Sequence, residues 1–130
     1  MSGSKVIRAK YLIDSVILID HLNGVKKATK WLARNGESNS VISVTTRAEI
    51  LCGADRDERY LISALLDRYQ CLPIDKKVAD MAAEFRQKFK LKLPDAFQAA
   101  LAKSNKLVLV TRNTKDFNKS MGFVNIPYRI

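Results

Sequence analysis

The chain has 130 residues, enough for one domain and too few for two of ordinary size. Hydrophobic residues make up 47% of it, so a normal core can form, yet no run approaches the ~20 apolar residues of a membrane helix. The formal net charge of +10 favours an anionic partner such as nucleic acid, with a merely solubilising basic surface as the alternative.

The single histidine and the two distant cysteines, Cys52 and Cys71, cannot supply the four ligands of a structural zinc site. Both cysteines are expected to be buried free thiols, with a single disulfide between them as the alternative. Residues 1–9 are expected to be a flexible start of a single domain that spans 1–130. They contain no apolar core of a secretory signal, so a cytoplasmic protein is expected.

In the first half of the chain, apolar patterning predicts two strands and three helices. The stretch before Asp14 is short, apolar and β-prone, as a buried strand requires. Asn35-Gly36 ends one helix, and Thr45 or Thr46 can cap another that runs through Glu49 and stops at Gly53. The elements lie, in chain order, at residues 10–13 (strand), 15–22 and 26–35 (helices), 40–44 (strand) and 45–52 (helix).

The second half continues the alternation. Pro94 is favoured in the first turn of a helix, and Leu107–Val110 is a continuous apolar run, typical of a buried parallel strand. The elements are predicted at residues 57–69 (helix), 71–74 (strand), 76–88 (helix), from 94 onward (helix), 107–110 (strand) and 123–126 (strand). Alternating strands and helices predict an α/β sandwich around a mostly parallel sheet.

The carboxyl ends of parallel strands form the usual ligand site of such a fold. Asp14 follows the first strand, and Thr111, Asn113 and Asp116 follow the strand at 107–110. These residues are therefore expected at one edge of the sheet.

Four acidic residues each have an ordinary structural explanation when taken singly. Asp14 is as well explained by a helix cap as by a site, and Glu49 suits a solvated helix face. Asp95 meets the dipole of a first turn favourably, and Asp116 suits a turn. As a set, however, three or four carboxylates gathered at one sheet edge would repel each other and would need a cation.

Oxygen ligands alone suit Mg²⁺ or Mn²⁺. Such an ion lowers the pKa of a water that it binds and neutralises charge on a phosphodiester, so hydrolysis needs no serine, cysteine or histidine nucleophile. Hydroxyl and amide side chains beside the acids would hold the carboxylates in place. These supporting residues are Ser15, Ser43, Thr46, Thr111 and Asn113.

With these motifs in view, the sequence resembles the PIN-domain ribonucleases, and among them the VapC toxins of type II toxin–antitoxin systems. The likeness is carried by four stretches in the family's order, which together span nearly the whole chain. They are Tyr11–Ile19 with Asp14-Ser15, Ser43–Gly53 with Ser-x-x-Thr-x-x-Glu, Leu93–Ala100 with Asp95-Ala96, and Leu109–Phe117 with Thr-x-Asn-x-x-Asp-Phe.

The resemblance implies a three-layer α/β/α sandwich and a metal-dependent endoribonuclease, with Mg²⁺ or Mn²⁺ held by Asp14, Glu49, Asp95 and an acid of the last motif. Family members place that acid at the position of Asn113, of Asp116, or of both. Because Asn113 is neutral here, Asp116 is predicted as the fourth ligand. Phe97-Gln98 replaces a small aliphatic pair of many members. The resemblance also implies a homodimer and a cognate antitoxin whose tail covers the acidic groove.

Basic residues near the motifs are candidates for contacts with the backbone of single-stranded or loop RNA. They are Arg47, Lys90, Lys92, Arg112 and Lys115. The competing hypothesis is a non-catalytic, basic nucleic-acid-binding or protein-binding module with a degenerate nuclease fold, in which the acids are caps and turns. DNA cleavage by the same residues is a third alternative.

Overall fold

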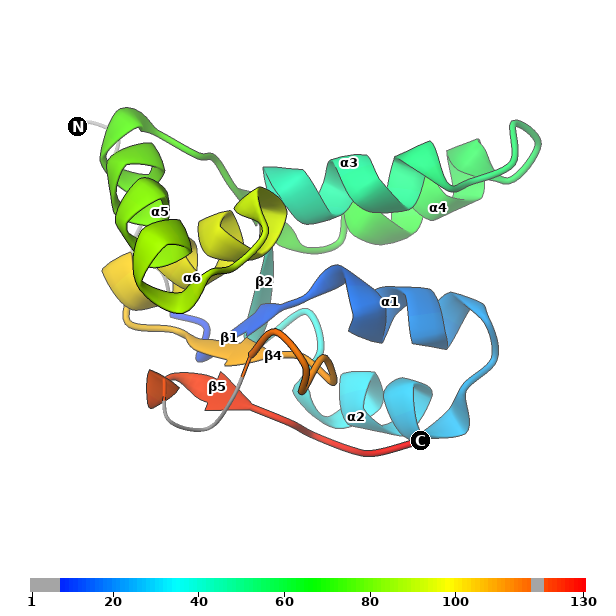
Figure 1. Cartoon of the computed structure of the whole chain (residues 1–130). Coiled ribbons are helices and arrows are strands. Elements are labelled where there is room, and N and C mark those ends of the chain that lie inside the picture. Colours follow the sequence, from blue (N-terminus) through cyan, green and yellow to red (C-terminus); the bar gives the residue numbers. More distant parts are fainter. Residues whose placement is uncertain (1–7, 118–120) are drawn as a thin grey trace.

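Figure 1 shows a computed structural model of the chain, which describes residues 8–117 and 121–130. Strands and helices alternate along most of the chain, as the sequence predicts. In chain order they are β1 (Tyr11–Ile13), α1 (Ser15–Leu22), α2 (Lys26–Asn35), β2 (Ser40–Ser43), α3 (Val44–Cys52), α4 (Arg59–Leu66), β3 (Gln70–Leu72), α5 (Lys76–Phe89), α6 (Leu93–Ser104), β4 (Val108–Val110) and β5 (Val124–Asn125).

The strands form one sheet in the order β3-β2-β1-β4-β5, and each neighbouring pair is parallel. Strand β1 lies in the middle, with Leu12 paired to Val41 on one side and to Leu109 on the other. The chain leaves β1 toward β2 and later returns to its other side as β4. This reversal opens a crevice at the carboxyl ends of β1 and β4, where open α/β sheets bind ligands.

Successive side chains of a strand point to opposite faces of the sheet, and this divides the core in two. Leu12, Val41 and Leu109 pack with α5 and α6 on one face. Ile13, Ile42 and Val110 pack on the other face, with α1, α2 and the inner sides of α3 and α4 (Figure 1). The three-layer α/β/α sandwich with a parallel sheet is therefore confirmed.

Four of the six buried residues of helix α6 are alanines. Ala96, Ala99 and Ala100 are completely buried, and their small side chains allow close packing on the core. One polar residue, Gln98, is buried among them. The packing of α6 fixes the position of its first turn, which carries Asp95.

Three local predictions are corrected. Strand β2 ends at Ser43, and Ser43 rather than Thr45 or Thr46 caps α3, because its hydroxyl accepts a hydrogen bond from the Thr46 amide at 3.0 Å. Helix α4 begins at Arg59, two residues later than expected, and ends at Leu66. Cys52 is exposed at the end of α3 and Cys71 is half-buried, so both thiols are free but neither is fully buried.

The predicted flexible start falls mostly outside the described residues, which begin at Arg8. Ala9 already packs against the cluster under α5 and α6, and the Lys10 amide donates to the Asn39 carbonyl at 3.0 Å. None of the helices described is long and apolar enough to cross a membrane.

Candidate active site

A cleft of about 550 Å³ opens where the carboxyl ends of β1 and β4 meet the helices α3 and α6. All four predicted acids line it, although they come from four separate segments of the chain. Asp14 follows β1, Glu49 lies on α3, Asp95 lies in the first turn of α6, and Asp116 lies in the loop after β4. The topology of the sheet thus brings together carboxylates that are far apart in sequence.

Asp14 is the most deeply placed of the four, with 6% of its surface exposed. It occupies the N-cap position of α1, yet its side chain makes no cap hydrogen bond. Its carboxylate accepts instead from the Thr111 hydroxyl at 2.7 Å and from the Gln98 amide at 3.3 Å. Burial raises the pKa of Asp14, and the hydrogen bonds from Thr111, Gln98 and the Ser15 backbone only partly oppose this.

Glu49 and Asp95 are close enough to the other acids to feel their charge. Burial, reinforced by Asp14 and Asp116, raises the pKa of Asp95 to about 6, and Lys92 partly opposes the rise. Burial also raises the pKa of Glu49, with further contributions from Asp14 and Asp95. Negative charge in the cleft is therefore unfavourable unless a cation neutralises it.

Asp116 is held by Asn113 in a local turn. The Asn113 side-chain amide donates to an Asp116 carboxylate oxygen at 2.8 Å, and the Asn113 side-chain oxygen accepts from the Asp116 backbone amide at 3.2 Å. The backbone amide of Asn113 donates to the Thr111 hydroxyl at 3.1 Å. The chain of contacts from Asp14 through Thr111 and Asn113 therefore links two of the acids.

The donor set of this cleft suits a hard cation that keeps part of its water. Across residues 8–117 and 121–130, no three acidic, histidine or cysteine side chains are grouped tightly enough to enclose a metal ion. One carboxylate can shift the pKa of another over a longer distance than that at which both could bind the same ion directly. The raised pKa values therefore agree with the loose grouping of the acids. Mg²⁺ commonly binds through one or two carboxylates, several waters and substrate phosphates, which an open cleft can accommodate.

Two of the predicted supporting residues, Ser43 and Thr46, precede Glu49 along the chain but bond to a side chain that is not one of the acids. The hydroxyls of Ser43 and Thr46 bond to the side chain of Gln98 and not to Glu49. Gln98 in turn donates to Asp14. Gln98 was not predicted as a site residue, although a single polar residue within an alanine-rich, apolar helix is a signal of a buried polar contact.

A family model of the PIN domain matches residues 11–120 of the chain. The chain belongs to the PIN-domain family. It is 31% identical to Ribonuclease VapC10 of Mycobacterium tuberculosis over 112 residues, which cover 82% of this chain and 84% of that one.

Solved structures also resemble this PIN domain. A toxin–antitoxin complex from Klebsiella pneumoniae matches it with a TM-score of 0.84 and 35% identity, over 92% of this chain and 99% of that chain. FitAcB from Neisseria gonorrhoeae matches with a TM-score of 0.79 over 92% and 99%, and at 22% identity it supports the fold alone.

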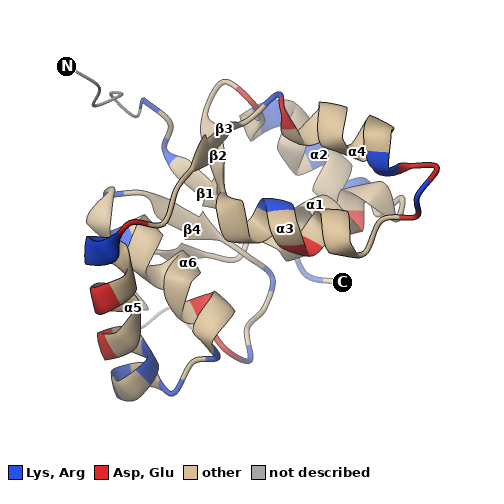
Figure 2. Ribbon diagram, turned by 90° about the horizontal axis from the view of Figure 1, so that it is seen from above, with Lys and Arg blue, Asp and Glu red and all other residues tan. Residues whose placement is uncertain are grey.

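The basic residues predicted to contact RNA fall into two groups in this PIN domain. Lys92, Arg112 and Lys115 line the cleft beside the acids. Lys90, exposed at the end of α5, and Arg47, half-buried on α3, do not line it. Figure 2 shows the basic segments at the end of α5 and in its connection to α6, beside the beginning of α6.

Arg47 and Arg112, the two arginines predicted to contact RNA, already pair with acidic side chains of this chain. The Arg112 guanidinium makes two hydrogen bonds to the buried Asp20 carboxylate, at 2.6 and 2.8 Å, and Tyr128 donates to the same carboxylate at 2.8 Å. The hydrogen bonding by Arg112 is the main reason for the lowered pKa of Asp20. Arg47 pairs with Asp67 of the α4 end at 2.8 Å. Arg112 therefore connects the loop after β4 to α1 and to the C-terminal segment.

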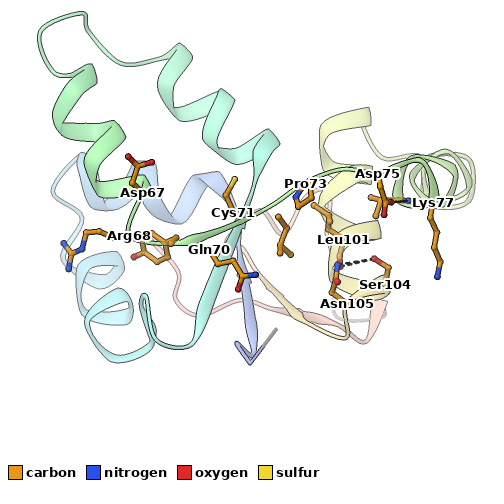
Figure 3. A pocket seen from close by; sticks show the side chains of 13 residues that line it. Asp67, Arg68, Gln70, Cys71, Pro73, Asp75, Lys77, Leu101, Ser104 and Asn105 are labelled. Carbon is orange, nitrogen blue, oxygen red and sulfur yellow. Dashed lines mark hydrogen bonds between the residues drawn. The ribbon is translucent and has the colours of Figure 1, made fainter. Parts of the chain in front are cut away.

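A second cleft, of about 910 Å³, lies beside the edge strand β3 (Figure 3). Two acidic and two basic residues line it, namely Asp67, Asp75, Arg68 and Lys77. The Asp75 carboxylate caps α5 by accepting from the Val78 amide at 2.9 Å. None of the four predicted acids lies there, so this larger cleft has no comparable gathering of like charge.

Proposed function

We propose that this PIN domain is an Mg²⁺- or Mn²⁺-dependent endoribonuclease and the toxin of a toxin–antitoxin pair. The observation that carries the proposal is the single cleft lined by four carboxylates from four segments, with Lys92 and Lys115 beside them. The similarity to Ribonuclease VapC10 supports the same activity. The substrate is single-stranded or loop RNA, whose backbone an open groove can follow.

Asp14, Glu49, Asp95 and Asp116 would hold the metal. When bound, Mg²⁺ or Mn²⁺ neutralises charge on the scissile phosphate and makes an attacking water more acidic. The chain's own part is to hold the acids in place: Thr111 and Ser15 hold Asp14, and Asn113 holds Asp116. Ser43 and Thr46 act on Asp14 through Gln98.

The antitoxin would be a separate protein whose tail covers the acidic cleft. The similarity to a toxin–antitoxin complex from Klebsiella pneumoniae supports such a partner. A homodimer and a cytoplasmic location belong to the same proposal.

The test is cleavage of total RNA and of single-stranded RNA and DNA oligonucleotides by antitoxin-free protein, with Mn²⁺, Mg²⁺ or EDTA. We expect discrete cuts in RNA that require a metal and disappear in EDTA. Cuts in DNA as well would widen the substrate class. Folded protein that cuts no RNA with either metal would support the competing hypothesis, in which the domain only binds nucleic acid or protein.

Lys92 and Lys115 are expected to contact RNA phosphates, and Lys90 and the arginines to contribute less because they lie off the cleft or are paired. Replacing both lysines with glutamine should weaken single-stranded RNA binding. It should also lower the slope of log affinity against log salt by about 1.4, since each contact contributes about 0.7. Binding is measured in EDTA, so that the RNA stays intact.

The matched control is Lys77→Gln, which removes one charge from the other cleft and should leave the slope nearly unchanged. Arg112 is left intact in this test because its loss would also break the ion pair with Asp20. If the double variant has the same salt slope as the wild type, neither lysine contacts the RNA phosphates.

A further inference from the structure

Gln98 is a buried amide at the point where three elements meet. It lies on α6 with 1% of its surface exposed, beneath the start of α3 and next to Asp14. A buried amide without hydrogen-bond partners would destabilise the fold. Within the described residues, however, every buried side-chain nitrogen and oxygen has a partner. Gln98 therefore belongs to a complete buried network.

The network gives the amide one orientation. The Gln98 Oε1 accepts from the Ser43 hydroxyl at 2.5 Å, while Nε2 donates to Thr46 Oγ1 at 3.0 Å and to Asp14 Oδ1 at 3.3 Å. If the amide were turned round, its oxygen would face the Asp14 carboxylate and the two would repel. Ser43 and Thr46 thus hold the amide so that a donor points at Asp14.

The hydrogen bond from Gln98 to Asp14 also connects Asp14 to the helix that carries Asp95. Asp95 and Gln98 are three residues apart on α6, so they lie on one side of the helix, with Asp95 at its beginning. Thr111 from the end of β4 holds the other oxygen of Asp14. Asp14 is therefore fixed from two directions, and one of the two is the helix that also carries Asp95.

We propose that Gln98 is a positioning residue for the metal site: held by Ser43 and Thr46, it sets the direction of the Asp14 carboxylate relative to Asp95. This inference rests on the proposed function, because it assigns to Asp14 a role in binding Mg²⁺ or Mn²⁺. An apolar residue at 98 would leave Asp14 Oδ1 without this donor, and Ser43 and Thr46 would keep only their hydrogen bonds to each other. The carboxylate would then turn more freely, and the metal would bind more weakly.

The test measures Mn²⁺ binding by calorimetry for the wild type, Gln98→Met and the surface control Gln87→Met, which lies exposed on α5. Methionine has nearly the length of glutamine and no donor. We expect Gln98→Met to bind Mn²⁺ about tenfold more weakly, the effect of losing an outer-shell partner of a ligand, and Gln87→Met to match the wild type. With RNA, kcat should fall while KM stays unchanged, because the lysines are intact.

Each outcome decides the question. Folded Gln98→Met with Mn²⁺ affinity within about twofold of the wild type would overturn the positioning role and leave the proposed function standing. Wild-type protein that binds no Mn²⁺ would overturn both. If Gln98→Met does not fold by circular dichroism, Thr46→Val and Thr46→Ser replace it. Weaker Mn²⁺ binding in Thr46→Val that is restored in Thr46→Ser would support the proposal. Mn²⁺ binding as tight in Thr46→Val as in Thr46→Ser and the wild type would refute it.

Discussion

Asp14→Asn is expected to reduce metal-dependent RNA cleavage by about 10³-fold or more, because a lost metal ligand removes several kcal/mol of transition-state stabilisation. Asparagine has nearly the same shape as aspartate and can still accept from the Thr111 hydroxyl, but it carries no charge for the metal. Initial rates are measured with Mn²⁺ at equal concentrations of folded protein, and folding is checked by circular dichroism.

The matched control for Asp14→Asn is Asp80→Asn, because Asp80 is exposed on α5 and does not line the cleft. It should cleave RNA at the wild-type rate. If Asp14→Asn cleaves as fast as Asp80→Asn, then Asp14 is no ligand and the proposed site is wrong. Residual cleavage that resists EDTA in both variants would instead indicate a contaminating nuclease.

Metal-free protein is expected to lose stability as the pH rises from about 4 to about 7.5. The folded state raises the pKa of Asp95 from 3.8 to about 6, and it also raises those of Asp14 and Glu49. A raised pKa means that the folded protein binds the proton more tightly than the unfolded chain does. The resulting stability is present below the unfolded pKa and is lost as the pH passes the folded one.

For Asp95 alone, the raised pKa corresponds to a loss of about 1–2 kcal/mol in the free energy of unfolding, after an allowance for the partial exposure of its carboxylate to solvent. Denaturant unfolding in EDTA across this pH range measures the loss. Asp95→Asn should flatten the profile and be the more stable protein near pH 7.5, whereas Asp80→Asn should follow the wild type. Saturating Mn²⁺ should restore the wild-type stability at the higher pH, because it binds only the folded state.

A profile that does not fall between these pH values in EDTA would show that the acids do not destabilise one another. A fall in stability with rising pH that Mn²⁺ reverses would mean that the metal-free site is less stable because its carboxylates lie close together. The bound cation would restore that stability.

Much of the fold follows from local sequence. Short apolar runs bounded by polar residues predicted the strands β1, β2 and β4, because a strand buried on both faces needs apolar side chains in succession. The alternation with helices then predicted the parallel sheet. Acids placed directly after strands β1 and β4 could be assigned to one edge, since parallel strands end on the same side. Asp95 and Glu49, which lie on helices, were assigned through the family motifs.

Only the tertiary structure decided the contacts between residues that are far apart in the sequence. Gln98 reaches Asp14 across 84 positions of sequence, and Arg112 reaches Asp20 across 92. Each pairing depends on how helices pack on the sheet. A polar residue in an alanine-rich helix shows that a partner is needed, and the packing selects which one. The same holds for the pKa of Asp95, because burial and the distance to other charges exist only in the folded chain.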